Sequence, residues 1–392
     1  MNVKHLQIDR ESQLVYLLSK IHISEEELDY IQKLFASYLD WSRVCGLVQM
    51  HRVVGIVWTN IRKYIIEERS KFVPFYFFKS TELIYKAQQL KAEEQFKLAS
   101  DVCHHLQAGG IKFVTLKGLV LSEYAYSGIG MRSSNDLDIL IHSSETKEVV
   151  RLLNELGYMH GQYHYNTREI IPVNREDVIK FPMISHQLHP MIRKTIDMTF
   201  VEFHNVDIQF SIDIRTNRKT DEIVSQLLEQ RIMAPIRDTE LPSLSWEDML
   251  IFLCIHFCKE AVDYKEVLKN KDMALYKLVD IYQLITRGKV SIDWDVFLEK
   301  VREYNMERET YYTLHYTEIV YPDTIPAHVL DRIRGADLSY LHQILDKDKI
   351  VYTWKDSIIE RIFDANRTAI LEQHLLEDFS TEAEGANEHR NG

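Results

Sequence analysis

The sequence predicts an α+β fold in which a strand-bearing core lies between two mainly helical regions. Helical periodicity without a convincing strand extends from the N-terminus to about Ala108, and it returns from Ser245 onward. Between these regions, segments rich in β-forming residues alternate with short helical segments. A chain of 392 residues also exceeds what one hydrophobic core usually supports, which favours two or three domains.

The N-terminal region, residues 1–108, is expected to be helical. Ser24 precedes three glutamates, a pattern typical of a helix start with an acidic first turn. Pro74 is expected to open a long helix that ends at Gly109-Gly110, because proline suits the first turn of a helix and glycine suits its end.

The core is expected at residues 109–215. Ile111–Leu116 and Leu137–Ile141 have the composition of strands, and Gly118–Tyr126 between them can form a short helix. A second helix is expected after them, beginning at Ser143 or Ser144 and ending at Gly157.

The second half of the core is less regular. Residues 160–194 show no clean period and contain three prolines, so we expect a long irregular insertion that covers the substrate side of the core. Beyond it, Thr195–Phe203 and Val206–Ile214 have strand composition on either side of His204-Asn205. This turn-prone pair suggests an antiparallel hairpin.

Residues 216–371 are predicted to form a helical C-terminal domain. Ser245 is followed three residues later by Asp248, which is a capping signal before the apolar run MLIFLCIHF. Further helices are expected at Leu275–Thr286, Asp293–Tyr304 and Glu309–Tyr321. The polar, glycine-bearing residues 372–392 are expected to form a flexible tail.

Composition and charge argue against several classes of protein. The net charge of −12 opposes the backbone of any long nucleic acid, so no such partner is expected. The N-terminus has no apolar signal region and the longest apolar stretch is too short to span a bilayer, so no membrane partner is expected. Four scattered cysteines are too few for a disulfide framework, which favours reduced thiols and a cytoplasmic location.

Candidate chemistry concentrates at Asp136 and Asp138, where a polar loop enters a predicted strand. Because side chains alternate along a strand, both carboxylates project from one face while Leu137, Ile139 and Ile141 face the other. Carboxylate oxygens suit Mg²⁺, which completes its shell with water and substrate phosphates. A solvated strand end has the same acid-x-acid pattern, so the metal interpretation depends on its context.

That context is the end of the preceding strand at Thr115-Leu116-Lys117-Gly118. A helix begins at this point, so its first backbone N–H groups and the lysine can face an anion. A phosphate group is therefore expected between Gly118 and Asp136.

With these residues, the sequence resembles the nucleotidyltransferase superfamily related to DNA polymerase β, which is marked by a glycine-led turn followed by an acid-x-acid strand. It also looks like a bacterial family of uncharacterised nucleotidyltransferases with the pattern LKG, an aromatic-containing helix and R-x-x-(N/S)-D-x-D-h-L-(V/I). The matching elements are Leu116-Lys117-Gly118, Tyr124, Tyr126, Arg132 and Asn135 to Ile141. The similarity extends from about Asp40 to Pro322.

The resemblance implies a small mixed β-sheet core in which three carboxylates hold two Mg²⁺ ions. Two of them are Asp136 and Asp138, and the third belongs on a neighbouring strand. We assign it to Asp207, whose segment follows the order and spacing of the family, although Gln209 stands where histidine is usual. Asp213 is the competitor, and at about 3.3 Å per residue it lies roughly 20 Å from Asp207, so only one of them can join the pair.

The resemblance also implies a bound nucleoside triphosphate, with ATP favoured. The residues expected to contact it are Lys117, Gly118, Arg132, Ser133 and Asn135. Leu119 stands where many superfamily members have serine, so the contacts should rely more on the cations and on backbone N–H groups.

The implied reaction is the Mg²⁺-dependent transfer of a nucleoside monophosphate, AMP favoured, to a hydroxyl of a small molecule, peptide or protein, with release of pyrophosphate. Family members often accompany natural-product or modified-peptide gene sets. A different class of function is a non-catalytic regulatory module that keeps the fold, similar to antitoxin partners. Retention of both acids, Lys117 and Arg132 argues against this alternative.

Two other clusters are weaker candidates. Cys254 and Cys258 share a helix face from which His256 points away, so a packed core helix is favoured over a zinc site. His186 and His189, within the insertion, remain candidates for contact with the nucleotide or the acceptor.

Overall fold

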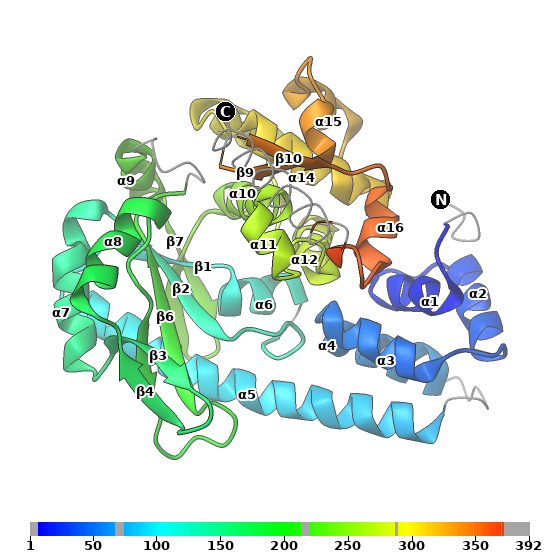
Figure 1. The fold of residues 1–392 in the computed structure, drawn as a ribbon, viewed down its shortest axis with the longest axis horizontal. Helices are drawn as coiled ribbons and strands as arrows, with labels where there is room; N and C mark the ends of the chain where they lie inside the picture. The colour runs from blue at the N-terminus through cyan, green and yellow to red at the C-terminus, as the bar shows by residue number, and fades with distance from the viewer. Residues whose placement is uncertain are drawn as a thin grey trace, which may run out of the picture.

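The fold is organised around one eight-stranded mixed sheet that has helices on both faces (Figure 1). The computed structural model describes residues 7–66, 74–126, 128–212, 220–286, 289–347, 349–369 and 371. In spatial order the strands are β4 (Glu169–Pro172), β3 (Met159–His164), β5 (Met191–Lys194), β6 (Phe203–Gln209), β2 (Asp136–Ile141), β1 (Phe113–Leu116), β8 (Thr239–Ser243) and β7 (Ile232–Ile236).

The centre of this sheet combines both strand orientations. β2 lies parallel to β6 and antiparallel to β1, and β1 lies parallel to β8. The outer pairs β3–β4, β3–β5, β5–β6 and β7–β8 are antiparallel. The predicted α+β class with a mixed sheet is therefore confirmed.

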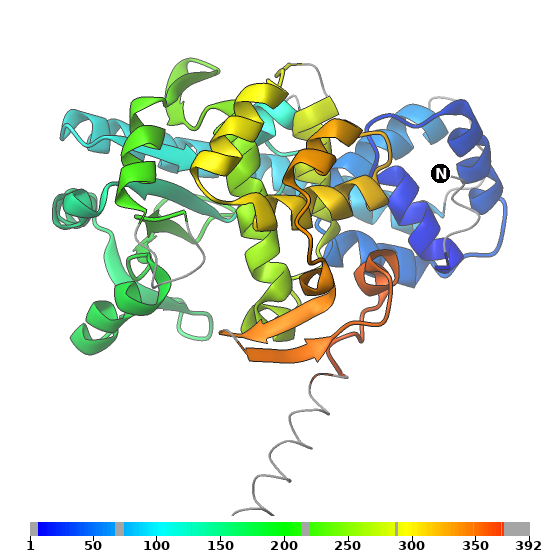
Figure 2. The ribbon, with the colours of Figure 1, turned by 90° about the horizontal axis from the view of Figure 1, so that it is seen from above.

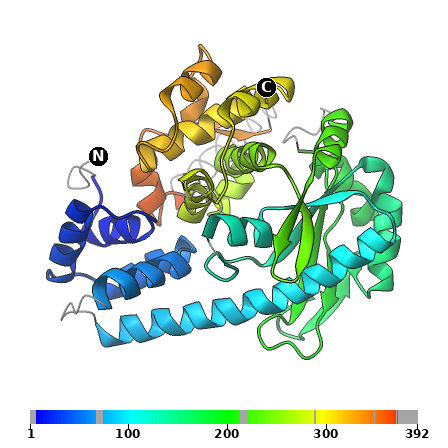
Figure 3. The same ribbon diagram turned by 180° about the vertical axis from the view of Figure 1, so that it is seen from behind.

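One face of the sheet packs against α5 (Phe75–Ala108) and α7 (Thr146–Glu155). In the view from behind, α5 runs from beneath the N-terminal helices to the sheet (Figure 3). Leu137, Ile139 and Ile141 of β2 belong to the buried cluster on this face. The predicted alternation of β2 is thus confirmed, and Asp136 and Asp138 project from the opposite face.

The opposite face is covered in part by α9 (Asp221–Glu229), which lies between β6 and β7 in the sequence, and by α10 (Trp246–Val262) and α12 (Leu275–Thr286), which follow the last strand of the sheet. The short helix α11 (Tyr264–Leu268) lies between α10 and α12 in the sequence. Val114, Leu116 and Leu140 of the sheet belong to one large core together with α9, α10 and α12. α6 (Gly118–Tyr126) connects the two cores, because residues from it are buried in each.

The large core also includes helices from both ends of the described chain. The N-terminal group is α1 (Arg10–Leu18), α2 (Glu25–Phe35), α3 (Trp41–Met50) and α4 (Val54–Asn60), with a π-helical turn at Ile61–Ile66. The C-terminal group is α13 (Trp294–Glu303), α14 (Glu307–Val320), α15 (Ala327–Ile333) and α16 (Ile358–Phe363). Seen from above, the sheet, the C-terminal helices and the N-terminal helices lie side by side (Figure 2).

Several helix boundaries agree with the sequence. Ser24 forms a complete capping box with Glu27, and the Ser245 hydroxyl accepts a hydrogen bond from the Asp248 backbone N–H. Pro74 and Gly109 bound α5 as predicted. The helices expected around 275–286, 293–304 and 309–321 are present within two residues of their predicted ends.

The expectations for residues 160–243 are partly wrong. The insertion is not irregular, because it contains most of β3, all of β4, α8 (Arg175–Ser185) and β5. The predicted hairpin is absent as well: β6 pairs with β5, and His204-Asn205 lies inside β6. The strands β7 and β8, and the separate hairpin of β9 (Gln343–Asp346) with β10 (Lys349–Thr353), were not predicted.

The strands β3 and β4 were missed because of their position in the sheet. β3 and β4 lie at one edge of the sheet and are mostly exposed, so they have no strict apolar alternation. Two further expectations, the competing acid Asp213 and the tail at 372–392, fall outside the described residues.

Two helical glycines provide a test of how the N-terminal helices meet the loop before β2. A Cβ atom on Gly55 in α4 would lie 2.1 Å from the backbone oxygen of Met131, whereas a Cβ on Gly46 in α3 meets nothing within 4 Å. We expect Gly55→Ala to destabilise the protein by about 1–3 kcal/mol because backbone must move, and Gly46→Ala to be neutral or stabilising by up to about 1 kcal/mol. Thermal melts that rank the two variants in the opposite order would contradict this contact.

Candidate active site

Three carboxylates converge where β2 and β6 lie side by side. In the parallel register Asp138 is opposite Asp207, and Asp136 is opposite Asn205. Because opposed residues and residues two apart share a face, Asp136, Asp138 and Asp207 project together. One oxygen from each can be chosen so that all three lie within 4.8 Å of one another. Asp136 and Asp207 are half-buried and Asp138 is buried, so the cluster has an inner and an outer side.

The clustering opposes ionisation of two of these acids. Burial raises the pKa of Asp138 to about 7; the neighbouring Lys117 acts against this rise, and Asp136 and Asp207 add to it. Burial and the Asp136 carboxylate likewise raise the pKa of Asp207 to about 6. Because ionisation of these buried acids is unfavourable, a cation that neutralises their charge is expected to bind well at this site.

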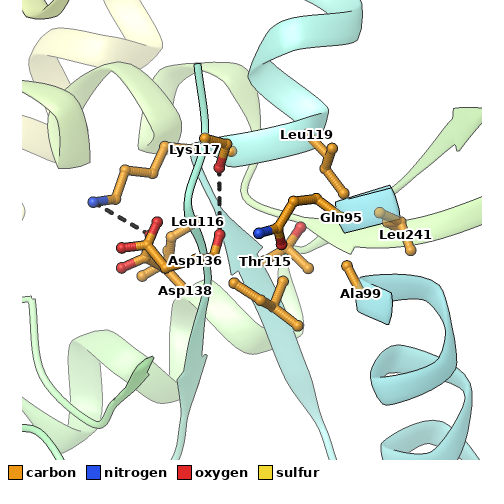
Figure 4. A pocket seen from close by; sticks show the side chains of 12 residues that line it. Gln95, Ala99, Thr115, Leu116, Lys117, Leu119, Asp136, Asp138 and Leu241 are labelled. Carbon is orange, nitrogen blue, oxygen red and sulfur yellow. Dashed lines mark hydrogen bonds and ion pairs between the residues drawn. The ribbon is translucent and has the colours of Figure 1, made fainter. Parts of the chain in front are cut away.

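Lys117 supplies the positive charge that the protein itself brings to this cluster. Its Nζ lies 3.3 Å from Asp138 Oδ2, and the ammonium points toward the carboxylates (Figure 4). Although burial acts in the other direction, the carboxylates of Asp138 and Asp136 raise the pKa of Lys117, so the ammonium stays charged.

The backbone at this turn is unusual. Lys117 and Gly118 both have positive φ, 47° and 50°, where β1 ends and α6 begins. A Cβ on Gly118 would have room, since its nearest neighbour, Ser134 Oγ, is 3.8 Å away, so glycine is favoured here by its backbone conformation. A lysine in the same left-handed region stores strain of about 1 kcal/mol or more, as residues at functional sites often do.

A small cavity lies on the inner side of this turn. Gln95 and Ala99 of α5, Thr115 of β1 and Leu119 of α6 line it together with Asp136 and Asp138 (Figure 4). Its volume of about 10 Å³ is at most that of one water molecule. This cavity is therefore too small to hold a nucleotide.

The loop before β2 is anchored by contacts that the sequence did not suggest. Gln95 Nε2 donates to the Asn135 carbonyl at 3.2 Å, and Lys91 Nζ donates to Asn135 Oδ1 at 2.6 Å. Ser134 Oγ donates to the Asp136 carbonyl at 3.3 Å. Two turns of α5 thus fix the entry of the strand that carries the acids.

Arg132 of this loop is deeply buried. Its Nε donates to both carboxylate oxygens of Asp280 in α12, at 3.0 and 2.9 Å, and its guanidinium lies over the Tyr276 ring. Tyr126 of α6 donates to the same carboxylate at 2.5 Å. One guanidinium nitrogen is therefore engaged by Asp280, which the sequence did not identify, and the phosphate contact expected of Arg132 stays a prediction.

Other sequence candidates are more dispersed. Among the described residues, the three aspartates are the only group of metal-ligating side chains that converge. Cys254 and Cys258 are free and buried in α10, as expected of a core helix. His256 is instead directed to Lys117, which helical periodicity alone could not show. His186 ends α8 with a left-handed backbone, and its contact with the nucleotide or the acceptor stays a prediction.

Comparison with known families identifies the chain. Residues 37–322 match the family described as "Uncharacterised nucleotidyltransferase". The chain belongs to this family. It is therefore a nucleotidyltransferase, a transferase enzyme that acts on a nucleotide substrate, and the family match spans both the carboxylate cluster and the helices around it. No match was found among curated proteins.

Two further observations bear on the surroundings of this nucleotidyltransferase. In the part of the chain that the structure describes, no helix combines the length and the apolar character needed to cross a membrane. The three carboxylates form a donor set of hard oxygen ligands, which fits a divalent cation such as Mg²⁺.

The buried pair of Arg132 and Asp280 has a predictable cost of disruption. Asp280→Asn leaves the guanidinium buried without its counter-charge, so we expect a loss of about 3–5 kcal/mol in the free energy of unfolding. The matched control is Asp295→Asn, which breaks the exposed pair with Arg332 and should change stability by less than about 1 kcal/mol. Equal melting temperatures for the two variants would contradict a structural role for the buried pair.

The raised pKa values predict opposite effects of pH on the protein without and with metal. In the folded protein the pKa values of Asp207 and Asp138 are raised to about 6 and about 7, from the ordinary value of 3.8. The stability that the protons on these carboxyls contribute is complete below pH 3.8 and is lost as pH rises through 6 to 7.

Because Mg²⁺ must displace these protons, its stabilising effect should grow over the same interval. Thermal melts at about pH 5.5 and about pH 8, each with a chelator or with Mg²⁺, measure both effects. A gain from Mg²⁺ that is equal at the two pH values would exclude the two acids as its ligands.

Proposed function

We propose that this nucleotidyltransferase transfers AMP from ATP to a hydroxyl of a small molecule, peptide or protein and releases pyrophosphate. The observation that carries the proposal is the convergence of Asp136, Asp138 and Asp207 within 4.8 Å on two adjacent parallel strands. The glycine-led turn beside an acid-x-acid strand supports placing the chain in the superfamily related to DNA polymerase β.

We assign two Mg²⁺ ions to this site, which the carboxylates of Asp136, Asp138 and Asp207 would hold. Bound there, Mg²⁺ supplies Lewis-acid stabilisation of the charge that develops on the phosphate oxygens. Asp207, half-buried on the outer side, is placed to accept the proton of the attacking hydroxyl. The acceptor oxygen then attacks the α-phosphorus while the bond to the leaving pyrophosphate breaks.

We place the triphosphate between the turn at Lys117-Gly118 and the loop at Ser133–Asn135. Lys117 offers a charged donor, and the start of α6 offers backbone N–H groups. Since Leu119 has no hydroxyl, these groups take the main share of the contacts. Arg132 contributes either through its remaining guanidinium nitrogens or by holding the loop against Asp280.

The helical regions are proposed to select the acceptor. We regard residues 109–215 as the catalytic unit, and residues 1–108 and 216–371 as the regions around it that form the outer side of the site. The net charge of −12 favours a small or peptidic acceptor over a long nucleic acid. The free thiols of Cys45, Cys103, Cys254 and Cys258 fit a reducing, cytoplasmic setting.

The reaction can be tested by following the label of the α-phosphate. With each nucleoside triphosphate labelled at that position, Mg²⁺ and a cell extract, we expect label to enter an acceptor with ATP as the preferred donor. Asp138→Asn and Asp207→Asn should lower the rate by about 10³-fold or more, because each removes a ligand charge while the fold is kept. Asp331→Asn, on an exposed face of α15, is the control.

The outcomes separate this reaction from others. Transfer of a label from the γ-phosphate alone would indicate a kinase and contradict the proposal. Full activity of a folded Asp207→Asn variant would remove Asp207 from the site while leaving the family assignment intact.

A further inference from the structure

A chain of polar side chains leads from the carboxylate cluster into the helical half of the molecule. Lys117 Nζ, besides its contact with Asp138, lies 3.2 Å from His256 Nε2 in α10. His256 Nδ1 lies 3.3 Å from Glu260 Oε2, one helical turn further on. Glu260 in turn accepts a hydrogen bond from Lys277 of α12. The chain thus connects the turn between β1 and α6 with α10 and α12.

The protonation of His256 follows from its neighbours. Burial lowers the pKa of His256 well below its ordinary value, and Lys117 and Lys277 lower it further, so the ring is neutral. A charged ammonium can only donate, so Nε2 has to accept the hydrogen bond from Lys117. The ring proton is then on Nδ1, which lies 3.3 Å from the Glu260 carboxylate.

We infer that His256 is a positioning residue that acts through Lys117, holding its ammonium beside the carboxylates with Nε2 as the acceptor. The inference rests on the proposed function and deepens it, because it names the group that orients the lysine toward phosphate. Neither neighbour of Lys117 along the chain can do this, since Leu116 and Gly118 lack polar side chains.

The arrangement matters when a divalent cation binds. A cation on Asp138 takes over the carboxylate oxygens to which Lys117 is otherwise paired. The lysine ammonium is carried on a flexible chain of four carbons, so its position would no longer be fixed without a second partner. His256 is a partner without charge, so it holds the ammonium without neutralising it, and the positive charge remains available to an anionic phosphate.

Glu260 and Lys277 explain why the imidazole itself is fixed. Lys277 is buried, with 7% of its side chain exposed, and it also donates to the Lys271 carbonyl in the turn before α12. This pair fixes the Glu260 carboxylate, which fixes the His256 tautomer. Burial and Asp136 raise the pKa of Asp207, and the Lys271 ammonium acts against that rise.

The test compares substitutions that keep or remove the acceptor. His256→Leu removes it, while His256→Gln offers an amide oxygen in a side chain of similar reach. Phe252→Leu is the control for packing, since the Phe252 ring lies 6.0 Å from the His256 ring and makes no hydrogen bond to Lys117 in the described structure. Binding of the Mg²⁺ complexes of ATP, GTP, CTP and UTP is measured by calorimetry, and the nucleotide that the parent binds most tightly is used for all variants.

We expect His256→Leu to weaken nucleotide binding by about tenfold, which corresponds to one lost charge-assisted hydrogen bond of about 1.4 kcal/mol. His256→Gln should restore most of the affinity, and Phe252→Leu should leave it within about twofold of the parent. In a Lys117→Ala background, His256→Leu should have no further effect, because the group through which it acts is gone. An equal loss with and without Lys117, or an equal loss in Phe252→Leu, would overturn the inference.

A second measurement needs neither a variant nor a nucleotide. Nitrogen chemical shifts of His256 in the parent protein report its tautomer, and we expect a protonated Nδ1 with an unprotonated Nε2. A protonated Nε2 would contradict the inference, and this result does not depend on whether the variants fold. If the parent bound no nucleotide while His256 showed the expected tautomer, the proposed function would fail and the hydrogen bond to Lys117 would stand.

Discussion

Asp138 and Asp207 lie opposite one another on adjacent parallel strands, and the like charge that this register brings together is the constraint on which the rest of the site depends. Three carboxylates within 4.8 Å repel one another, and burial of Asp138 makes the repulsion stronger. The fold tolerates the cluster through two compensations. One is the ammonium of Lys117, and the other is the uptake of protons by Asp138 and Asp207, which raises their pKa values.

The surrounding structure can be understood as the support of this costly arrangement. The apolar side of β2 is fixed by α5 and α7, so its polar side cannot rotate away. The loop that enters β2 is tied to α5 through Asn135 and to α12 through Arg132. Lys117 is held by a strained turn and by α10. Supports therefore come from segments far apart in sequence, and these segments lie within residues 37–322, which match the family.

The sequence was informative where local chemistry decides structure. Strand alternation placed Asp136 and Asp138 on one face, and capping at Ser24, Ser245 and Gly109 fixed helix ends. The sequence did not predict the elements whose position is set by pairing between strands of the sheet. The positions of β3, β4, β7 and β8 depend on pairing with neighbouring strands and not on their own residue pattern, and residues 195–202 separate β5 from its partner β6. The partners Asp280 and His256 were missed for the same reason, since an aspartate or a histidine in an apolar helix gives no local sign of a contact more than a hundred residues away.

Asp280 and His256 also show that burial has opposite consequences for the two cations of the motif. Arg132 is paired with the Asp280 carboxylate, which also accepts a hydrogen bond from Tyr126, so the charge of Arg132 is largely compensated within the protein. Lys117 shares its ammonium between a carboxylate that a metal can claim and a neutral imidazole that cannot compensate charge. Once a cation engages Asp138, the charge of Lys117 is the less compensated of the two. Of two basic residues that the motif presents alike, we therefore propose Lys117 as the one that contacts phosphate and Arg132 as the one that holds the loop.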